Sequence, residues 1–194
     1  MILIVAPEAE AVAAVLALHG WDCRIAADVG THARATPELV ICCVEGSAGA
    51  RVAYPLVPIV ALADAGWIAA EEAQARACDD VVDRARLHDD LALIVADWMH
   101  AERLALLDRL AAAFGEANIA TLLDGLKNTL EAALRETDDA MLAADAHRIA
   151  GLAGTLGFAR LGRQWLCVAH GQRPITPATR RATAHALATI GLMK

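Results

Sequence analysis

The hydrophobic pattern of this 194-residue chain changes near its middle, and the change limits the folds open to it. In the first half, apolar residues form short continuous runs, which are typical of strands covered on both faces in a parallel sheet. In the second half, apolar residues recur at helical spacing and mark one face of successive amphipathic helices. We therefore expect two domains of different class, one over 1–97 and one over 98–194.

The first half is predicted to be an α/β domain. Its apolar runs have the length of strands, and helical patterns or short connections separate them. They are 2–5 (ILIV), 23–27 (CRIAA), 38–44 (ELVICCV), 57–63 (VPIVALA) and 80–83 (DVVD). Repeated strand–helix units of this length favour a doubly wound, five-stranded parallel sheet.

The second half is predicted to be entirely α-helical. Helical patterns joined by short turns cover 87–115, 116–137, 138–156, 159–171 and 176–194. In the last of these, Thr176 is suited to cap the helix and Pro177 to occupy its first position. Several such helices are expected to pack as an antiparallel bundle, and the boundary between the two domains falls within the pattern that begins at 87.

Charge and composition argue against several classes of partner. The net charge of −7 divides into −9 for 1–97 (6 basic, 15 acidic) and +2 for 98–194 (11 basic, 9 acidic). Neither half has the dense basic stripe of a nucleic-acid-binding protein. No apolar run approaches the roughly 18 residues of a membrane span. We expect neither nucleic acid nor membrane as a partner.

Cysteine and histidine spacing gives no sign of a disulfide framework or a metal site. The five cysteines are odd in number and include no CxxC pair, which fits a reduced, cytoplasmic protein. His19, His32, His88 and His100 show no convincing metal-ligand spacing among themselves. No intrinsic metal or cofactor is expected.

One histidine in the second half has unusual neighbours. His147 lies in the stretch AHRIAGLAGTLGF (146–158), although each glycine in a helix interior costs about 1 kcal/mol relative to alanine. An apolar stripe on this helix is formed by Leu142, Ile149 and Ala153. At about 100° per residue, His147 lies about 140° from the stripe, Gly151 about 180° and Gly154 about 120°. The spacing predicts an exposed imidazole beside a strip without side chains.

An exposed imidazole of this kind can act as a nucleophile. An unperturbed imidazole has a pKa near 6.5 and is largely neutral at pH 7, so that one ring nitrogen can attack a phosphoryl group. Phosphoryl transfer depends mainly on positioning and charge stabilisation, so the histidine side needs little machinery of its own. The alternative is that His147 is an ordinary surface histidine.

The segment HRIAGLAGTLG resembles the motif of histidine-containing phosphotransfer (HPt) domains. That motif has a histidine, a lysine three residues later, and glycines at +4 and +10, which match His147, Gly151 and Gly157. The stretches FGEANIATLLDGL and LGFARLGRQW also resemble the family, and the resemblance covers roughly 102–172, with a weaker match in the final helix. It implies a helical bundle in which His147 is the phosphoacceptor and Gly154 extends the open strip.

The chain departs from this motif at Ala150, where the family usually has the lysine that helps to hold the phosphoryl group. Arg148 lies about 100° around the helix and is an imperfect substitute. Other cations that could supply positive charge are Arg160, Arg163 and Lys127.

The first half resembles the receiver domains of response regulators, over about 1–97. Receivers carry a Mg²⁺-binding acidic pair after the first strand, a phosphorylated aspartate at the third, a threonine or serine at the fourth and a lysine at the fifth. The corresponding positions here are Ala6 and Pro7 (followed by Glu8), Cys43, Ala63 and Arg84. Without the carboxylates, neither Mg²⁺ binding nor aspartyl phosphate formation is expected. The resemblance implies a degenerate receiver used for docking, dimerisation or regulation.

Together the two resemblances predict a phosphorelay intermediate of two-component signalling. His147 would carry a phosphoryl group between the receiver domains of a hybrid histidine kinase and of a response regulator, and the partner receiver would supply Mg²⁺. A non-catalytic adaptor that sequesters a kinase or regulator is the alternative, and Ala150 favours it. The dimerisation part of a histidine kinase is a third possibility, which the glycines after His147 fit poorly. No segment resembles an ATP-binding site, so autophosphorylation is not expected.

Overall fold

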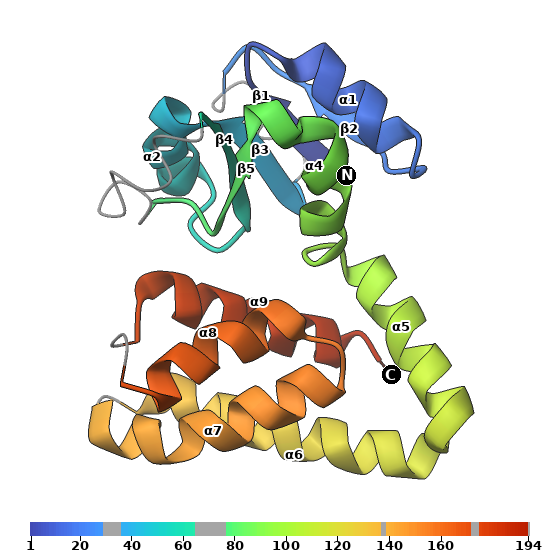
Figure 1. Cartoon of the computed structure of the whole chain (residues 1–194), viewed down its shortest axis with the longest axis vertical. Helices are drawn as coiled ribbons and strands as arrows, with labels where there is room; N and C mark the ends of the chain where they lie inside the picture. Colours follow the sequence, from blue (N-terminus) through green and yellow to red (C-terminus); the bar gives the residue numbers. More distant parts are fainter. Residues whose placement is uncertain (29–35, 65–76, 137–138, 172–174, 194) are drawn as a thin grey trace. The chain divides into compact units, whose positions relative to one another are not determined.

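The computed structural model describes residues 1–28, 36–64, 77–136, 139–171 and 175–193. The chain divides into two compact units, 1–99 and 100–194 (Figure 1). No helix in the described ranges is long and apolar enough to cross a membrane.

The first unit contains the predicted five-stranded parallel sheet. The strands are β1 (Ile2–Val5), β2 (Cys23–Ile25), β3 (Leu39–Cys43), β4 (Ile59–Ala63) and β5 (Asp80–Asp83). Their order is β2-β1-β3-β4-β5, and every neighbouring pair is parallel. All five residues of β4 are buried, which explains why the continuous apolar run identified this strand.

Three α-helices of the first unit lie within its described ranges. They are α1 (Ala9–Ala17), α2 (Val44–Ala53) and α4 (Leu87–Ala96), and the 3₁₀ turn η3 (Arg84–Arg86) precedes α4. Helix α2 packs on β3 and β4, whereas α1 and α4 contact each other. The side chains of Val44 and Ala50 join a buried cluster with Val40, Ile59 and Ala61. The sequence also has a helical pattern at 71–77 (EEAQARA), between the fourth and fifth predicted strands, and this stretch lies almost wholly outside the described residues.

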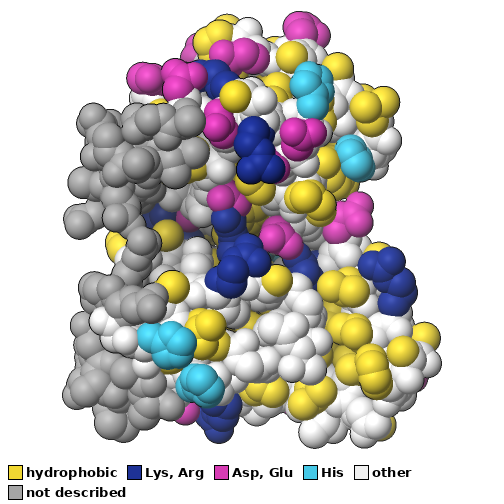
Figure 2. Space-filling view, viewed as in Figure 1, with side chains coloured by type: hydrophobic (Ala, Val, Ile, Leu, Met, Phe, Trp, Pro, Cys, Tyr) yellow, Lys and Arg dark blue, Asp and Glu magenta, His cyan; other side chains and the backbone are white. Residues whose placement is uncertain are grey.

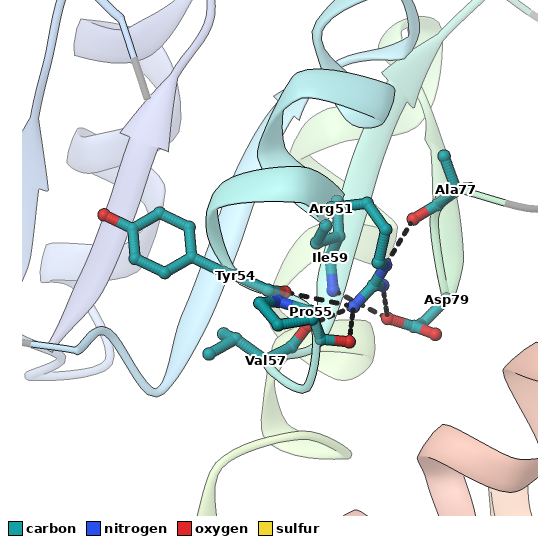
Figure 3. A network of polar contacts seen from close by, with 7 residues as sticks. All are labelled: Arg51, Tyr54, Pro55, Val57, Ile59, Ala77 and Asp79. Carbon is teal, nitrogen blue, oxygen red and sulfur yellow. Dashed lines mark hydrogen bonds and ion pairs between the residues drawn. The ribbon is translucent and has the colours of Figure 1, made fainter. Parts of the chain in front are cut away.

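A buried arginine–aspartate network ties the end of α2 to the strands (Figure 3). Arg51 donates from Nη2 to Asp79 Oδ2 (2.5 Å), and the same oxygen accepts from the Ile59 amide (2.9 Å). The other guanidinium nitrogens donate to the carbonyls of Tyr54, Pro55, Val57 and Ala77. The Asp79 side chain is 1% exposed. Losing one partner of such a buried pair lowers the free energy of unfolding by about 3–5 kcal/mol, so this network stabilises the unit.

The second unit is helical throughout its described residues. Its helices are α5 (His100–Phe114), α6 (Glu116–Arg135), α7 (Asp139–Thr155), α8 (Ala159–Ala169) and α9 (Pro177–Gly191). Helix α6 packs against α5, α7 and α9, and α8 packs against α7 and α9 (Figure 1). Thr176 caps α9 by accepting a hydrogen bond from the Thr179 amide (3.1 Å), with Pro177 in the first turn, as predicted.

The predicted helix over 87–115 is wrong in one respect, because the chain interrupts it. Helix α4 ends at Ala96, and α5 begins at His100. The side chains of Trp98 and Met99, between the two helices, are buried. The free energy gained by burying two large apolar side chains is larger than that of the helical hydrogen bonds lost at the interruption. The residues 97–99 include neither glycine nor proline, so no local sequence signal marked the break.

Candidate functional site

Helix α7 buries one face and exposes the other, as its sequence predicted. The buried positions are Leu142, Ala146, Ile149, Ala153 and Leu156. His147, Gly151 and Gly154 are exposed on the opposite face. The placement leaves the imidazole accessible to a second protein.

Both ring nitrogens of His147 are free of hydrogen bonds within the described part of the chain. Among the described residues, none forms a hydrogen bond or an ion pair with this side chain; its one ring contact is with His170, at 6.4 Å between centroids and 40° between planes. His170 is the C-cap of α8 and is also exposed. Figure 2 shows histidine side chains next to one another on the surface of the helical unit. The amino-acid sequence alone does not pair these residues, because no spacing rule relates positions on two different helices.

Gly162 explains why α8 lies so close to the helix that carries His147. It is buried, and a Cβ at this position would lie 3.1 Å from the Ala150 carbonyl oxygen and 3.3 Å from the Gly154 nitrogen. The absence of a side chain therefore lets the two backbones approach each other. Trp165 Nε1 donates to Thr183 Oγ1 (3.1 Å) and joins α8 to α9 on its other side. Helix α8 is thus held firmly beside α7.

The three glycines after His147 have two different roles. A Cβ at Gly151 or Gly154 would meet no atom of a neighbouring element within 4 Å, so internal packing does not require glycine at either position. Gly157 has φ +80°, and a Cβ there would collide with the Leu106 side chain. Its carbonyl accepts a hydrogen bond from Arg103 of α5. Gly157 therefore ends α7 for structural reasons, whereas the first two glycines leave a bare surface.

Within the described part of the chain, none of the cations considered as substitutes for the missing lysine forms a hydrogen bond or an ion pair with His147. Arg148 pairs with Asp145 on the same helix (Nη2–Oδ1 3.2 Å), and Lys127 pairs with Glu131 on α6 (Nζ–Oε1 3.9 Å). Arg160 is half-buried and Arg163 is exposed on α8. Their supporting role stays a prediction.

At the carboxyl ends of the strands, the first unit brings together the residues aligned with the receiver site. Arg84, directly after β5, pairs with Glu8 (Nε–Oε1 3.0 Å) and with Asp64 (Nη1–Oδ2 3.5 Å). Ala6 and Pro7 follow β1 and offer no carboxylate, and Ala63 ends β4. Arg84 therefore has a carboxylate partner in each of two other segments, and the two carboxylates and one guanidinium carry a formal net charge of −1. We call Glu8, Asp64 and Arg84 the sheet-edge cluster.

The two adjacent cysteines of β3 differ in environment. Cys43, at the position aligned with the receiver aspartate, is half-buried and is the N-cap of α2. Cys42 points into the core, where burial, with smaller contributions from Cys43 and Cys78, raises the pKa of its thiol to about 12. A thiol so reluctant to ionise is a poor nucleophile. All five cysteines are free thiols.

Two further observations bear on function. Within the described ranges, no three histidine, cysteine, aspartate or glutamate side chains are grouped so as to hold a metal ion. Comparison of the chain with family models, with curated proteins and with solved structures finds no match.

Proposed function

We propose that this chain is a cytoplasmic phosphorelay intermediate of two-component signalling, in which His147 carries the phosphoryl group. The proposal treats the second unit as an HPt-like antiparallel bundle and the first as a doubly wound, degenerate receiver. One observation supports it above the others. His147 is exposed, makes no hydrogen bond with the described residues, and lies beside two glycines that internal packing does not require.

The chemistry follows from an accessible imidazole. A ring nitrogen of His147 attacks the phosphorus of an aspartyl phosphate on a partner receiver; the N–P bond forms as the bond to the aspartate oxygen breaks, and the carboxylate leaves. The reverse reaction delivers the phosphoryl group to an aspartate of a second receiver. The partner receivers supply Mg²⁺ and most of the charge stabilisation. The bare strip at Gly151 and Gly154 gives the partner room to approach.

Transfer from a phosphorylated receiver tests the proposal directly. Receiver domains from the same organism, labelled with radioactive acetyl phosphate, are mixed with the full chain. We expect acid-labile, base-stable label on the wild type and none on His147→Gln. The control is His88→Gln, which changes an exposed histidine of the first unit and should keep full labelling. Equal labelling of His147→Gln, or no labelling of the wild type by any receiver, contradicts the proposal.

A non-catalytic adaptor is the second candidate. Ala150 favours it, as does the sheet-edge cluster, whose charges are already paired with one another. An adaptor predicts tight binding of a receiver or kinase with no label on the chain, and the same binding by wild type and His147→Gln. The transfer experiment therefore separates the two functions.

A further inference from the structure

The second unit contains two pairs of neighbouring histidine side chains. The two pairs differ in burial and in the hydrogen bonds that their ring nitrogens form. His100 and His185 stack at 4.4 Å between centroids and 16° between planes, and a hydrogen bond joins His100 Nδ1 to Thr189 Oγ1 (2.7 Å). Both rings of this pair are half-buried. The rings of His147 and His170 lie 6.4 Å apart and tilted, both exposed. Neither His147 nor His170 has a side-chain hydrogen bond within the described part of the chain.

The open pair has the chemistry to hold an anion between its rings. A phosphoryl group on a side chain brings about two negative charges and three acceptor oxygens. A histidine ring donates one hydrogen bond when neutral and two when protonated. Hydrogen bonds from a charged donor to a phosphate are about twice as strong as neutral ones. His170 is the ring nearest to the group that His147 would carry.

Two side chains close to His147 on its own helix are less suited to this role. Ala150, one turn after His147, has no donor, and Arg148 is engaged by Asp145. His170, in contrast, is fixed by its backbone: its amide donates to the Leu166 carbonyl (3.1 Å) at the end of α8, and Gly162 seats that helix against α7.

We propose that His170 is a phosphoryl-binding residue, donating a ring N–H to a phosphoryl oxygen on His147 and so stabilising the phosphorylated form. No bond other than this hydrogen bond forms or breaks at His170, and its proton stays on the ring. The inference rests on the proposed function of His147.

The equilibrium of phosphoryl exchange with a receiver provides the first test. On one side of this equilibrium are the phosphorylated chain and the unphosphorylated receiver, and on the other are the unphosphorylated chain and the phosphorylated receiver. All four species are unbound, so the equilibrium constant does not depend on how tightly the two proteins dock. We expect His170→Phe, which keeps a ring but has no donor, to lower this constant about tenfold, the value of one charge-assisted hydrogen bond. His170→Lys should restore most of it, and His88→Phe should change nothing. Unfolding midpoints should agree across the series, because His170 is exposed.

A second test needs no receiver. Phosphoramidate phosphorylates histidine directly, and ³¹P NMR then reports the phosphoryl group on His147, with His147→Gln identifying any signal from other histidines. We expect the His147 resonance to move in His170→Phe and to return toward its original position in His170→Lys. If phosphoramidate phosphorylates His147 but no receiver transfers a phosphoryl group to it, the proposed function is refuted. The shift of the His147 resonance in His170→Phe would still support the contact with His170. Transfer from receivers with an unchanged equilibrium and an unmoved resonance would refute the role of His170.

Discussion

In the proposed function, the sheet-edge cluster stands at the degenerate receiver site and the exposed face of α7 carries the phosphoacceptor, and the polar groups of the two places behave in opposite ways. In the cluster, Arg84 contacts both Glu8 and Asp64, so each charge already has a partner within the unit. On α7, the ring of His147 has no hydrogen-bond partner among the described residues. The sheet-edge charges are held by ion pairs with one another, whereas an imidazole with no hydrogen-bond partner among the described residues can still receive a ligand. This difference supports the proposal that the first place is structural and that the phosphoryl group is carried on α7.

The largest expected difference between the two places is in phosphorylation itself. We expect Cys43→Asp, incubated with acetyl phosphate and Mg²⁺, to take up no label in the first unit. The new aspartate lacks the acidic pair that holds Mg²⁺, because Ala6 and Pro7 stand there and Glu8 is paired with Arg84. The substitution should fold, since aspartate is a favourable N-cap residue and position 43 caps α2. A base-labile phosphoryl group found on the introduced carboxylate by mass spectrometry would contradict the view that the first unit is not phosphorylated.

Gly157→Ala should cause the largest loss of stability among the glycine variants of α7. An alanine loses about 1–2 kcal/mol in the left-handed conformation, and its Cβ collides with Leu106, which adds about 1–3 kcal/mol. Urea denaturation measures the sum. Gly171→Ala is the matched control, because it also has positive φ (+65°) but nothing within 4 Å of the added Cβ. It should lose only the conformational part, and equal losses in the two variants would contradict the collision.

Gly151→Ala should have the opposite effect on stability and a harmful one on transfer. The added methyl group meets nothing, so the gain in helix propensity should raise the free energy of unfolding by up to about 1 kcal/mol. In the proposed function, the same methyl group lies on the face that a receiver would approach, so the transfer rate should fall. Gly125→Ala in α6, exposed and equally open, should gain stability with unchanged transfer. Normal transfer by Gly151→Ala would show that the bare strip is not used.

The smallest expected effect is that of Arg84→Ala. The side chain of Arg84 is 29% exposed and that of Asp64 is 82% exposed, and such partly solvated pairs contribute about 0–1 kcal/mol. Arg51→Ala, which breaks a buried pair, should cost several times more in the same urea titration. A large loss of unfolding free energy in Arg84→Ala would mean that the sheet-edge cluster contributes strongly to the stability of its unit.

The sequence by itself determined the local elements and their faces. Continuous apolar runs located all five strands, with errors of one or two residues at the ends of β2, β3 and β4. Helical spacing identified the exposed side of His147, and Thr176 with Pro177 marked the start of α9. These features depend on the backbone conformations that each residue prefers and on the burial of one periodic face. Both properties are encoded within a single segment. The interruption at 97–99 was missed because the burial of Trp98 that it permits is not a local property.

Only the tertiary structure decided which side chains meet. The pairing of Arg84 with Glu8 and Asp64, the fastening of Arg51 to Asp79, and the approach of His170 to His147 each join separate elements. Such contacts depend on how helices and strands pack, and no spacing along the chain encodes the distance between two elements. Gly162 illustrates the reason: its sequence context resembles that of any helical glycine, and its importance lies in the backbone of α7 against which it packs.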